Sequence, residues 1–379
     1  MDRENFRKSV LARHGASDEE VVELLRYNAN LFDHARLAQP LSFPLPDEPF
    51  VSAWREYAAA SSGTFNVLKE HLAQLNFPVR EGISRTEGYR RATLSGVSAE
   101  TIPEATGLEL EEPEAIRLFI HPTPAGHIPV MVAGSRADFV SLVRALLMKN
   151  EPAFVPDSRG GAAVSGYNNW GRIRWYREDW ERENPSIYPL EAWREEFERL
   201  IPRKELDQDR FLILSDGPYS NVPASDMGLA DDEWKRLSLA IRLEHESTHY
   251  FTQRLFGSMR DCLFDELLAD YRGIIAASGR YHAQWALRFL GLESFPIYRK
   301  GGRLENYPGN PPLSTGAFRI LQSLVKDAAE NLERIDIDFR GGRPDWSMLI
   351  ALSRMTLEEL ASEEACERFE TCLKQSPSV

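Results

Sequence analysis

Cysteine is scarce in this chain, where 379 residues include three: Cys262, Cys366 and Cys372. Three cysteines without a C-x-x-C spacing support neither a disulfide framework nor a cysteine-rich zinc site, and they suit a reducing compartment. The sequence also lacks an apolar run of membrane-spanning length and a charged-then-apolar signal segment at its start. We therefore expect a cytoplasmic protein with no membrane partner.

Positive charge is in deficit as well. Lys and Arg total 45 against 58 Asp and Glu, which gives a formal net charge of −13. A nucleic-acid backbone requires a basic face, so this balance predicts no nucleic-acid partner. Hydrophobic residues make up 42% of the chain, enough for a substantial core. An acidic globular protein of this kind suits a peptide or a small molecule as its substrate.

Histidine is also rare, with eight in the chain, yet two of them lie four residues apart in the HExxH motif of residues 245–249. Side chains four apart on a helix share one face, so His245 and His249 can bind one metal ion. Glu246, beside the first histidine, can act as a base toward a water at that metal. The motif therefore predicts a metal site.

The residues around the motif predict one helix over 231–256. Asp231 is the expected N-cap, and apolar residues recur at helical spacing on both sides of the motif. Gly257 is a natural C-terminal stop. Both histidines are therefore expected in the middle of a helix.

A second helix, over about 261–278 and closed by Gly279, is expected to supply the third ligand after a turn at 257–259. Glu266 and Asp270 are four residues apart and share a face of that helix. If the two helices pack antiparallel, Glu266 comes level with His249 and completes the metal site. Asp270 then comes level with His245 and can accept a hydrogen bond from its non-ligating nitrogen.

This arrangement resembles the gluzincins, a group of zincin metallopeptidases in which HExxH is followed, on a second helix, by a Glu ligand and four residues later by an Asp. The wider block of residues 245–274 is also similar to an uncharacterised bacterial protein family. Two positions depart from the gluzincin pattern: Arg242 stands where a small or apolar residue is usual, and Ser247 stands where an apolar one is usual.

The resemblance implies a zinc cofactor, a zincin-like fold and a downstream Tyr or His that stabilises the oxyanion of the reaction. The sequence offers several candidates for that last role and does not choose among them: Tyr271, His282, Tyr298 and Tyr307. In zincins an edge strand pairs with extended substrate, and residues 127–133 or 211–214 are candidates for it.

The function expected from these residues is that of a zinc-dependent hydrolase, metallopeptidase-like or amidase-like, with Glu246 as general base. One alternative is a non-heme Fe(II) oxygenase, because two histidines and a carboxylate also form its facial triad. If that enzyme used 2-oxoglutarate, Arg272 or Arg299 could bind the cosubstrate. A second alternative is a non-catalytic interaction protein with a vestigial site.

Along the chain we predict an N-terminal helical segment (1–80), an α+β region (81–230) and a helical metal-binding region (231–379). In the α+β region, apolar runs at 115–121 and 127–133 predict a hairpin, and Ser135 should cap the helix that follows. The glycine-rich stretch 157–170 is expected to be a loop. Three residues at its end are candidate substrate contacts: Asn168, Asn169 and Trp170. The fold class expected is α+β, a small antiparallel sheet packed on a mainly helical half.

Overall fold

The computed structural model describes residues 2–38, 41–185, 189–200, 202–204, 208–257 and 262–376. The chain divides into two compact units. One is the continuous segment 44–217, and the other combines residues 1–43 with 218–379. The N-terminal helices thus share a unit with the C-terminal region. The division expected from the sequence, into segments 1–80, 81–230 and 231–379, does not contain this association. The fold is α+β and mainly helical, with a small mixed sheet.

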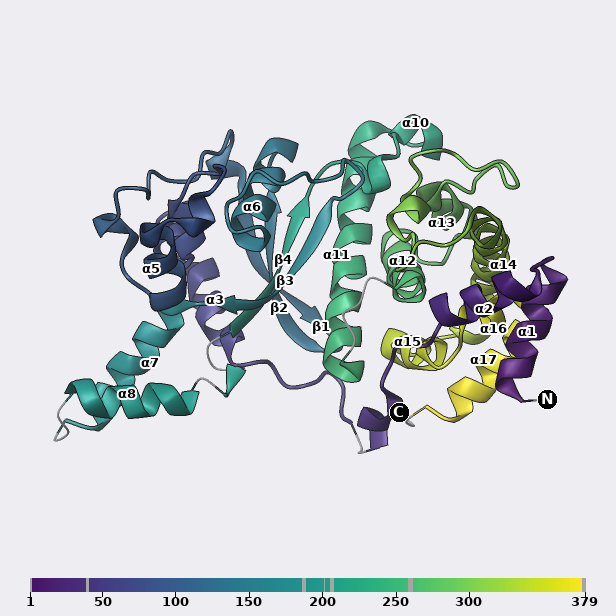
Figure 1. The fold of residues 1–379 in the computed structure, drawn as a ribbon, viewed down its shortest axis with the longest axis horizontal. Coiled ribbons are helices and arrows are strands. Elements are labelled where there is room, and N and C mark those ends of the chain that lie inside the picture. Colours follow the sequence, from purple (N-terminus) through teal and green to yellow (C-terminus); the bar gives the residue numbers. More distant parts are fainter. Residues whose placement is uncertain are drawn as a thin grey trace. The chain divides into compact units, whose positions relative to one another are not determined.

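The continuous unit contains a four-stranded sheet in the order β1-β2-β4-β3 (Figure 1). Its strands are β1 (Arg117–Thr123), β2 (Gly126–Ala133), β3 (Gly161–Asn168) and β4 (Gln208–Ser215). The predicted hairpin is confirmed, since β1 and β2 pair antiparallel with Thr123 opposite Gly126. β2 and β4 pair in parallel, so the expectation of an antiparallel sheet is wrong. A parallel pair needs a long crossover, and here β3 and the helices around it lie between the two strands in sequence.

Two further expectations for this sheet are corrected. The glycine-rich stretch forms β3, which pairs antiparallel with β4. Its register shifts between Ser165 and Tyr167, where Gly166 takes a φ of 72° that favours glycine. The segments 127–133 and 211–214, considered as edge strands, belong to β2 and β4, which lie inside the sheet. The edges of the sheet are β1 and β3.

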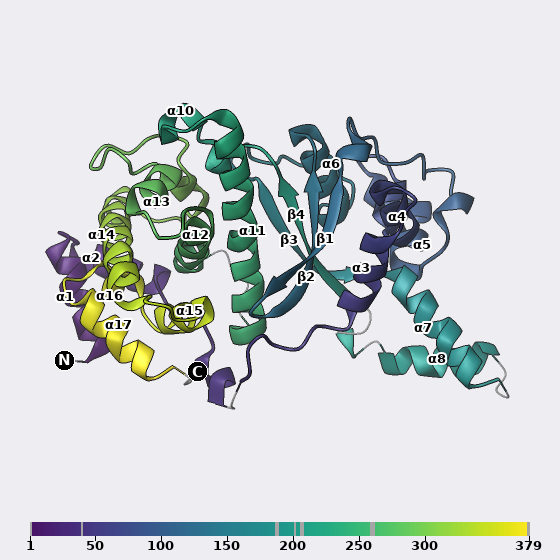
Figure 2. The same cartoon turned by 180° about the vertical axis from the view of Figure 1, so that it is seen from behind.

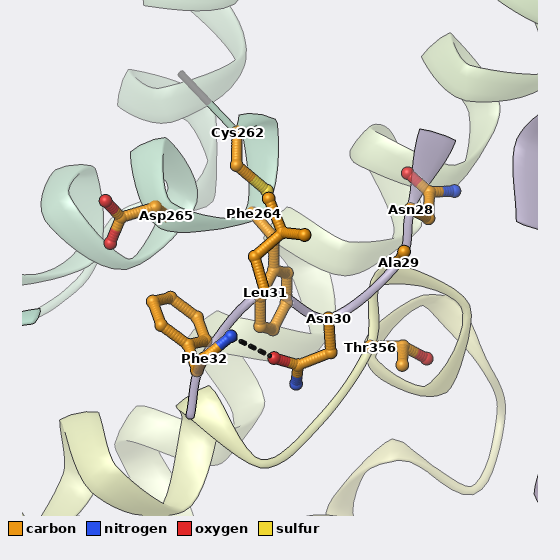
Figure 3. Close-up of a pocket in the computed structure, with 9 residues that line it drawn as sticks. All are labelled: Asn28, Ala29, Asn30, Leu31, Phe32, Cys262, Phe264, Asp265 and Thr356. Carbon is orange, nitrogen blue, oxygen red and sulfur yellow. Dashed lines mark hydrogen bonds between the residues drawn. The ribbon is translucent and has the colours of Figure 1, made fainter. Parts of the chain in front are cut away.

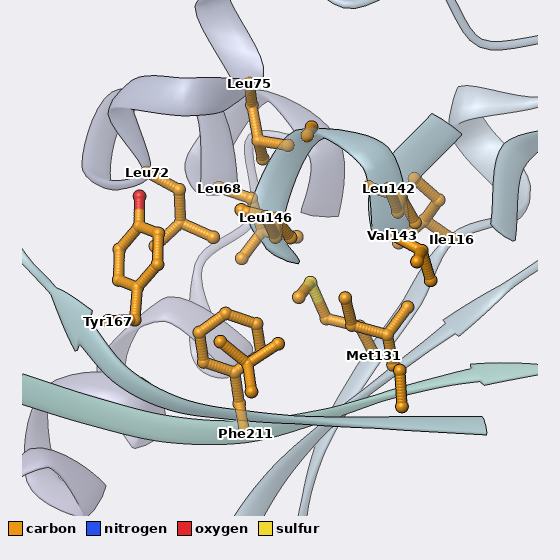
Figure 4. Packing of buried hydrophobic residues seen from close by; sticks show 14 of the residues in the cluster. Leu68, Leu72, Leu75, Ile116, Met131, Leu142, Val143, Leu146, Tyr167 and Phe211 are labelled. Carbon is orange, nitrogen blue, oxygen red and sulfur yellow. The ribbon is translucent and has the colours of Figure 1, made fainter. Parts of the chain in front are cut away.

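The core of this unit lies between the sheet and its helices. Ser135 caps α6 as predicted, because its side chain accepts a hydrogen bond from the backbone N–H of Asp138. Leu142 and Leu146 of α6 face Met131 and Phe211 of the sheet (Figure 4). Each buried side chain of this size contributes about 1.5–3 kcal/mol. The helices of the unit are α3 (Phe50–Ala59), α4 (Thr64–His71), α5 (Glu87–Ser95), α6 (Arg136–Leu147), α7 (Trp170–Glu183) and α8 (Pro189–Leu200). Short 3-10 helices are η2 (Ala73–Asn76), η3 (Ile83–Arg85), η4 (Ala99–Thr101) and η5 (Pro113–Ala115).

The discontinuous unit is helical and contains the HExxH motif. Its elements are α1 (Arg3–Arg13), α2 (Asp18–Tyr27), η1 (His34–Ala38), η6 (Tyr219–Asn221), α10 (Ala224–Met227), α11 (Asp231–Phe256), α12 (Leu263–Ser278), α13 (Ala283–Leu290), η7 (Arg303–Asn306), α14 (Thr315–Phe339), α15 (Asp345–Ser353), α16 (Leu357–Ala361) and α17 (Ala365–Lys374). The helix predicted over 231–256 is confirmed as α11. Its N-cap is Ala230, so Asp231 is the first helical residue and stabilises the helix dipole instead of capping it. Among the described residues, no helix is both long and apolar enough to pass through a bilayer.

Polar contacts join the two ends of this unit. Figure 2 shows α1 next to α16, although they stand at opposite ends of the sequence. The guanidinium Nε of Arg7 lies 2.9 Å from Glu358 Oε2, and Asn28 Nδ2 donates to Glu358 Oε1 at 3.0 Å. Glu358 is fully buried, so these bonds replace the water that its carboxylate loses.

Candidate metal centre

α11 and α12 lie side by side (Figure 1) and run antiparallel. Ile241 is opposite Gly273, and His245 is opposite Asp270, so numbers rise along one helix as they fall along the other. A Cβ on Gly273 would stand 2.6 Å from the backbone oxygen of Ile241, so only glycine permits this approach. Gly257 ends α11 with a φ of 69°. Residues 258–261, on which the predicted turn and the start of the second helix fall, lie outside the described residues.

The close packing of the two helices brings His245, His249 and Glu266 together. The Nε2 atoms of the two histidines are 3.1 Å apart. Each lies 3.4 Å from an oxygen of Glu266, His245 from Oε2 and His249 from Oε1. Ligand atoms about 2.0–2.1 Å from a tetrahedral zinc ion are separated by about 3.3–3.4 Å. The three side chains therefore present their ligand atoms at the spacing that a zinc ion requires.

The other nitrogen of each histidine is held by a buried carboxylate. His245 Nδ1 lies 3.0 Å from Asp270 Oδ1, the contact expected from the sequence. His249 Nδ1 lies 2.9 Å from Asp265 Oδ2. An ionised carboxylate only accepts hydrogen bonds, so each Nδ1 is the donor and each Nε2 is left with its lone pair when the ring is neutral. The two lone pairs and the Glu266 carboxylate then face one another, an arrangement that attracts a cation.

The pKa values of the three residues reflect this attraction. Burial alone would lower the pKa of His249, but Asp265 and Glu266 outweigh it and raise that pKa well above its usual value. Burial would also lower the pKa of His245, but its hydrogen bonds to Asp270 and Glu266 outweigh burial and raise that pKa. Burial would raise the pKa of Glu266, but the two histidines hold it well below its usual value. The cluster thus binds protons when no metal competes for it.

Asp270 is fixed by two residues that the sequence analysis missed. The Tyr219 hydroxyl donates to Asp270 Oδ1 at 2.7 Å and lies 2.9 Å from His245 Nδ1. Arg303 donates from NH1 to the Tyr219 oxygen at 2.7 Å and from NH2 to Asp270 Oδ2. Burial would raise the pKa of Asp270, but Arg303 and His245 outweigh it and lower that pKa. The ionised Asp270 therefore stays an acceptor for His245.

Asp265 was also missed, and its environment differs from that of Asp270. Its Oδ2 holds His249, while its Oδ1 is buried and has no hydrogen-bond partner among the described residues. A small cavity of about 10 Å³ is lined by Asp265 together with Phe32 and Cys262 (Figure 3). The rule that each histidine ligand has a partner on its second nitrogen could have revealed Asp265.

The two departures from the gluzincin pattern are both buried in α11. Arg242 donates from NH2 to the backbone oxygen of Pro218 at 3.1 Å, and its guanidinium carbon lies 5.7 Å from the centroid of the Tyr219 ring. It therefore fixes the segment that carries Tyr219. Ser247 has a buried Oγ with no partner in the described part of the chain.

Comparison with known proteins identifies a family for this chain. Residues 9–364 match one protein family over most of the sequence. The chain belongs to the family of unknown function DUF7005. No curated protein and no solved structure matches it. The matched residues of this DUF7005 chain include the candidate metal cluster of His245, His249 and Glu266, so its chemistry has to be argued from the site.

The predicted base of this DUF7005 chain, Glu246, is half-buried on α11 next to His245. Its carboxylate forms no hydrogen bond or ion pair with the residues that the structure describes. The neighbouring Glu244, in contrast, lies 3.2 Å from Arg272 NH2. Glu246 is therefore not committed to a structural contact.

The structure separates the four candidates for oxyanion stabilisation. Tyr271 donates to Asp336 Oδ1 at 3.0 Å, and Tyr298 donates to the backbone oxygen of Gly302 at 2.9 Å. His282 stacks on Trp285 with ring centroids 5.4 Å apart. Burial, followed by the negative charge of Glu266, raises the pKa of Tyr307 well above the usual value. Among the four, Tyr307 is the one whose pKa responds to the charge of Glu266.

The candidate substrate contacts belong to the continuous unit, where their polar groups are engaged. Asn169 is buried and donates from Nδ2 to Asp209 Oδ2 at 2.7 Å, while its side-chain oxygen caps α7. Trp170 Nε1 donates to the backbone oxygen of Thr93 at 2.8 Å, and Asn168 Oδ1 accepts from Gln208 Nε2 at 3.2 Å. These contacts give the three residues a structural role in their own unit.

Proposed function

We propose that this chain is a zinc-dependent hydrolase that cleaves an amide or peptide bond. His245, His249 and Glu266 would hold the zinc ion. The observation that carries the proposal is the convergence of their three ligand atoms at separations of 3.1–3.4 Å. Neutral histidines in this geometry direct two lone pairs and a carboxylate at one point, which only a cation placed there would make favourable.

The number of ligands supports a catalytic site over a structural one. Structural zinc sites usually have four protein ligands, whereas catalytic sites have three and leave one position open. Within the described part of the chain, no fourth His, Cys, Asp or Glu joins the three. The side chains of His249 and Glu266 are 16% and 12% exposed, so solvent reaches the cluster. A zinc ion held there would polarise a carbonyl and lower the pKa of a water toward about 7.

The residues around the cluster supply the remaining chemistry. Glu246 would take a proton from the attacking water and pass it to the leaving amine. A tyrosine is protonated near pH 7 and the pKa of Tyr307 is raised further, so its hydroxyl can donate to the developing oxyanion. Asp265 and Asp270 hold the two imidazole rings in the tautomer that exposes Nε2.

An Fe(II) oxygenase is the second candidate, because iron accepts the same ligands. The cations expected to bind 2-oxoglutarate are engaged elsewhere. Arg272 NH2 lies 3.2 Å from Glu244 and 3.3 Å from Asp345, and Arg299 bonds to Glu293. These ion pairs favour the hydrolase. A purely interacting protein with a vestigial site is the third candidate. Metal content separates the hydrolase from the oxygenase, and activity separates both from the interacting protein.

The decisive experiment is the metal content of protein purified anaerobically, without chelator or nickel affinity resin. We expect about one zinc per chain, lost in His245→Ala and in Glu266→Ala. His282→Ala is the matched control, since this histidine lies away from the cluster, and it should keep the zinc. Stoichiometric iron would favour the oxygenase. No metal in any variant, with no binding of added zinc, would refute the metal site.

Catalysis is tested separately with Glu246→Gln and a library of short peptides and acyl amides. Because the ligands are intact, the variant should keep its zinc, and because the base is lost its rate should fall by about two to four orders of magnitude. Full activity in the variant would remove Glu246 from the mechanism.

A further inference from the structure

An open groove of about 510 Å³ lies in the discontinuous unit, apart from His245, His249 and Glu266. Ligand sites for small molecules commonly have volumes of about 300–1,000 Å³. Three arginines from separate elements line it: Arg3 of α1, Arg354 after α15 and Arg368 of α17. We call it the arginine groove.

Two of these arginines have acidic partners. Arg3 donates to both oxygens of Glu359, from Nε at 2.9 Å and from NH2 at 2.6 Å. Arg368 NH1 lies 3.5 Å from Glu359, and its NH2 lies 3.1 Å from Glu364. Glu359 is thus shared by both guanidinium groups, and Glu364 pairs with Arg368.

Arg354 is different, because its guanidinium has no hydrogen bond or ion pair with the described residues. Its Nε is buried, although the residue as a whole is partly exposed. A partly buried cation without a counter-ion is unfavourable. Three guanidinium groups against two carboxylates therefore leave the groove with an uncompensated positive charge at Arg354.

The histidine beside the arginines responds to this charge. Burial, followed by Arg354 and Arg3, lowers the pKa of His34 to about 4. His34 is therefore neutral near pH 7, with its Nε2 3.1 Å from the hydroxyl oxygen of Ser353. It lines the groove as a hydrogen-bonding group, while the positive charge belongs to the arginines.

We propose that the arginine groove binds a small phosphate monoester, with Arg354 as its principal contact. A carboxylate offers two oxygens in one plane, which a single guanidinium can satisfy. A phosphate monoester presents three terminal oxygens in different directions and suits guanidinium groups that approach from three elements. This site is independent of the proposed zinc chemistry, and none of its residues belongs to the metal cluster.

Calorimetric titration of the full chain with inorganic phosphate and with glycerol phosphate, at constant ionic strength, tests the proposal. We expect saturable binding that Arg354→Gln weakens by about tenfold or more, and that Arg354→Lys weakens less. Arg319→Gln is the matched control, because Arg319 is exposed on α14 and does not line the groove; it should bind as the wild type does. Melting curves verify that each variant is folded.

Three results would overturn the proposal. One is the absence of saturable heat at millimolar concentrations of both probes. Another is binding that Arg354→Gln leaves unchanged and His245→Ala abolishes, which would place the anion at the metal cluster. The third is tighter binding of succinate than of glycerol phosphate, which would assign the groove to dicarboxylates.

Discussion

The role of Asp265 gives the sharpest test of the metal centre. Its carboxylate accepts the Nδ1 hydrogen of His249 at 2.9 Å, and it is the leading cause of the raised pKa of that histidine. Asp265→Asn keeps the shape of the side chain and removes its charge. A charge-assisted hydrogen bond is about twice as strong as a neutral one, so the ring is held less firmly and its Nε2 becomes less basic.

Loss of such a partner typically weakens metal binding by about 10–100-fold, or about 1.4–2.7 kcal/mol. Asp265→Asn retains a neutral acceptor, so we expect about tenfold weaker zinc binding, and about a hundredfold for Asp265→Ala. Competition with a chromophoric chelator measures both, with Asp338→Asn, an exposed carboxylate on α14, as the control. The pKa of His249 in metal-free Asp265→Asn should also fall, which NMR can follow. A folded Asp265→Asn with wild-type zinc affinity would refute the reasoning.

Four other predictions follow from the same geometry. Gly273→Ala should destabilise the protein by about 1–2 kcal/mol in denaturant unfolding despite the better helix propensity of alanine, because its Cβ would clash with Ile241; an unchanged midpoint would contradict this. Tyr307→Phe should keep the zinc and lower kcat about a hundredfold, and an unchanged kcat would exclude Tyr307 as the oxyanion donor. Zinc affinity should rise with pH by up to about a hundredfold per unit while His245 and His249 are protonated in the metal-free protein, and a flat profile would show that they are not. Folding raises the pKa values of both His245 and His249, so the stability that their protonation contributes is complete below about pH 6.5. That contribution is lost as the pH rises through the raised pKa values. The melting temperature of the metal-free protein should therefore fall on going from neutral to alkaline pH.

The sequence predicted the parts of the site that follow from helical geometry. His245, His249, Glu266 and Asp270 lie on two helices joined by a short connection, so spacing along the chain is enough to place them near one another. Their meeting depends on Gly273, which no periodicity singles out. The metal and the chemistry at these residues stay predictions.

The remaining parts depend on long-range contacts. Tyr219 and Arg303 come from short 3-10 helices before α11 and after α13, where the sequence has no repeating pattern. The strand β3 was missed because its glycines and alanines carry little strand propensity, and the pairing with β4 outweighs this. Trp170 and Asn169 follow that strand directly, so once it is known their structural role is expected.

The discontinuous unit combines residues from both ends of the chain, and this has a consequence for its synthesis on the ribosome. Arg7 and its partner Glu358 are 351 residues apart in the sequence. At about 5–20 residues per second, translation separates them by roughly 18–70 s. During that interval the continuous segment 44–217 is completed, while α1 and α2 have emerged without the helices that bury them. The N-terminal helices therefore precede the helices that bury them by the longest interval, and the unit that contains His245, His249 and Glu266 is completed last.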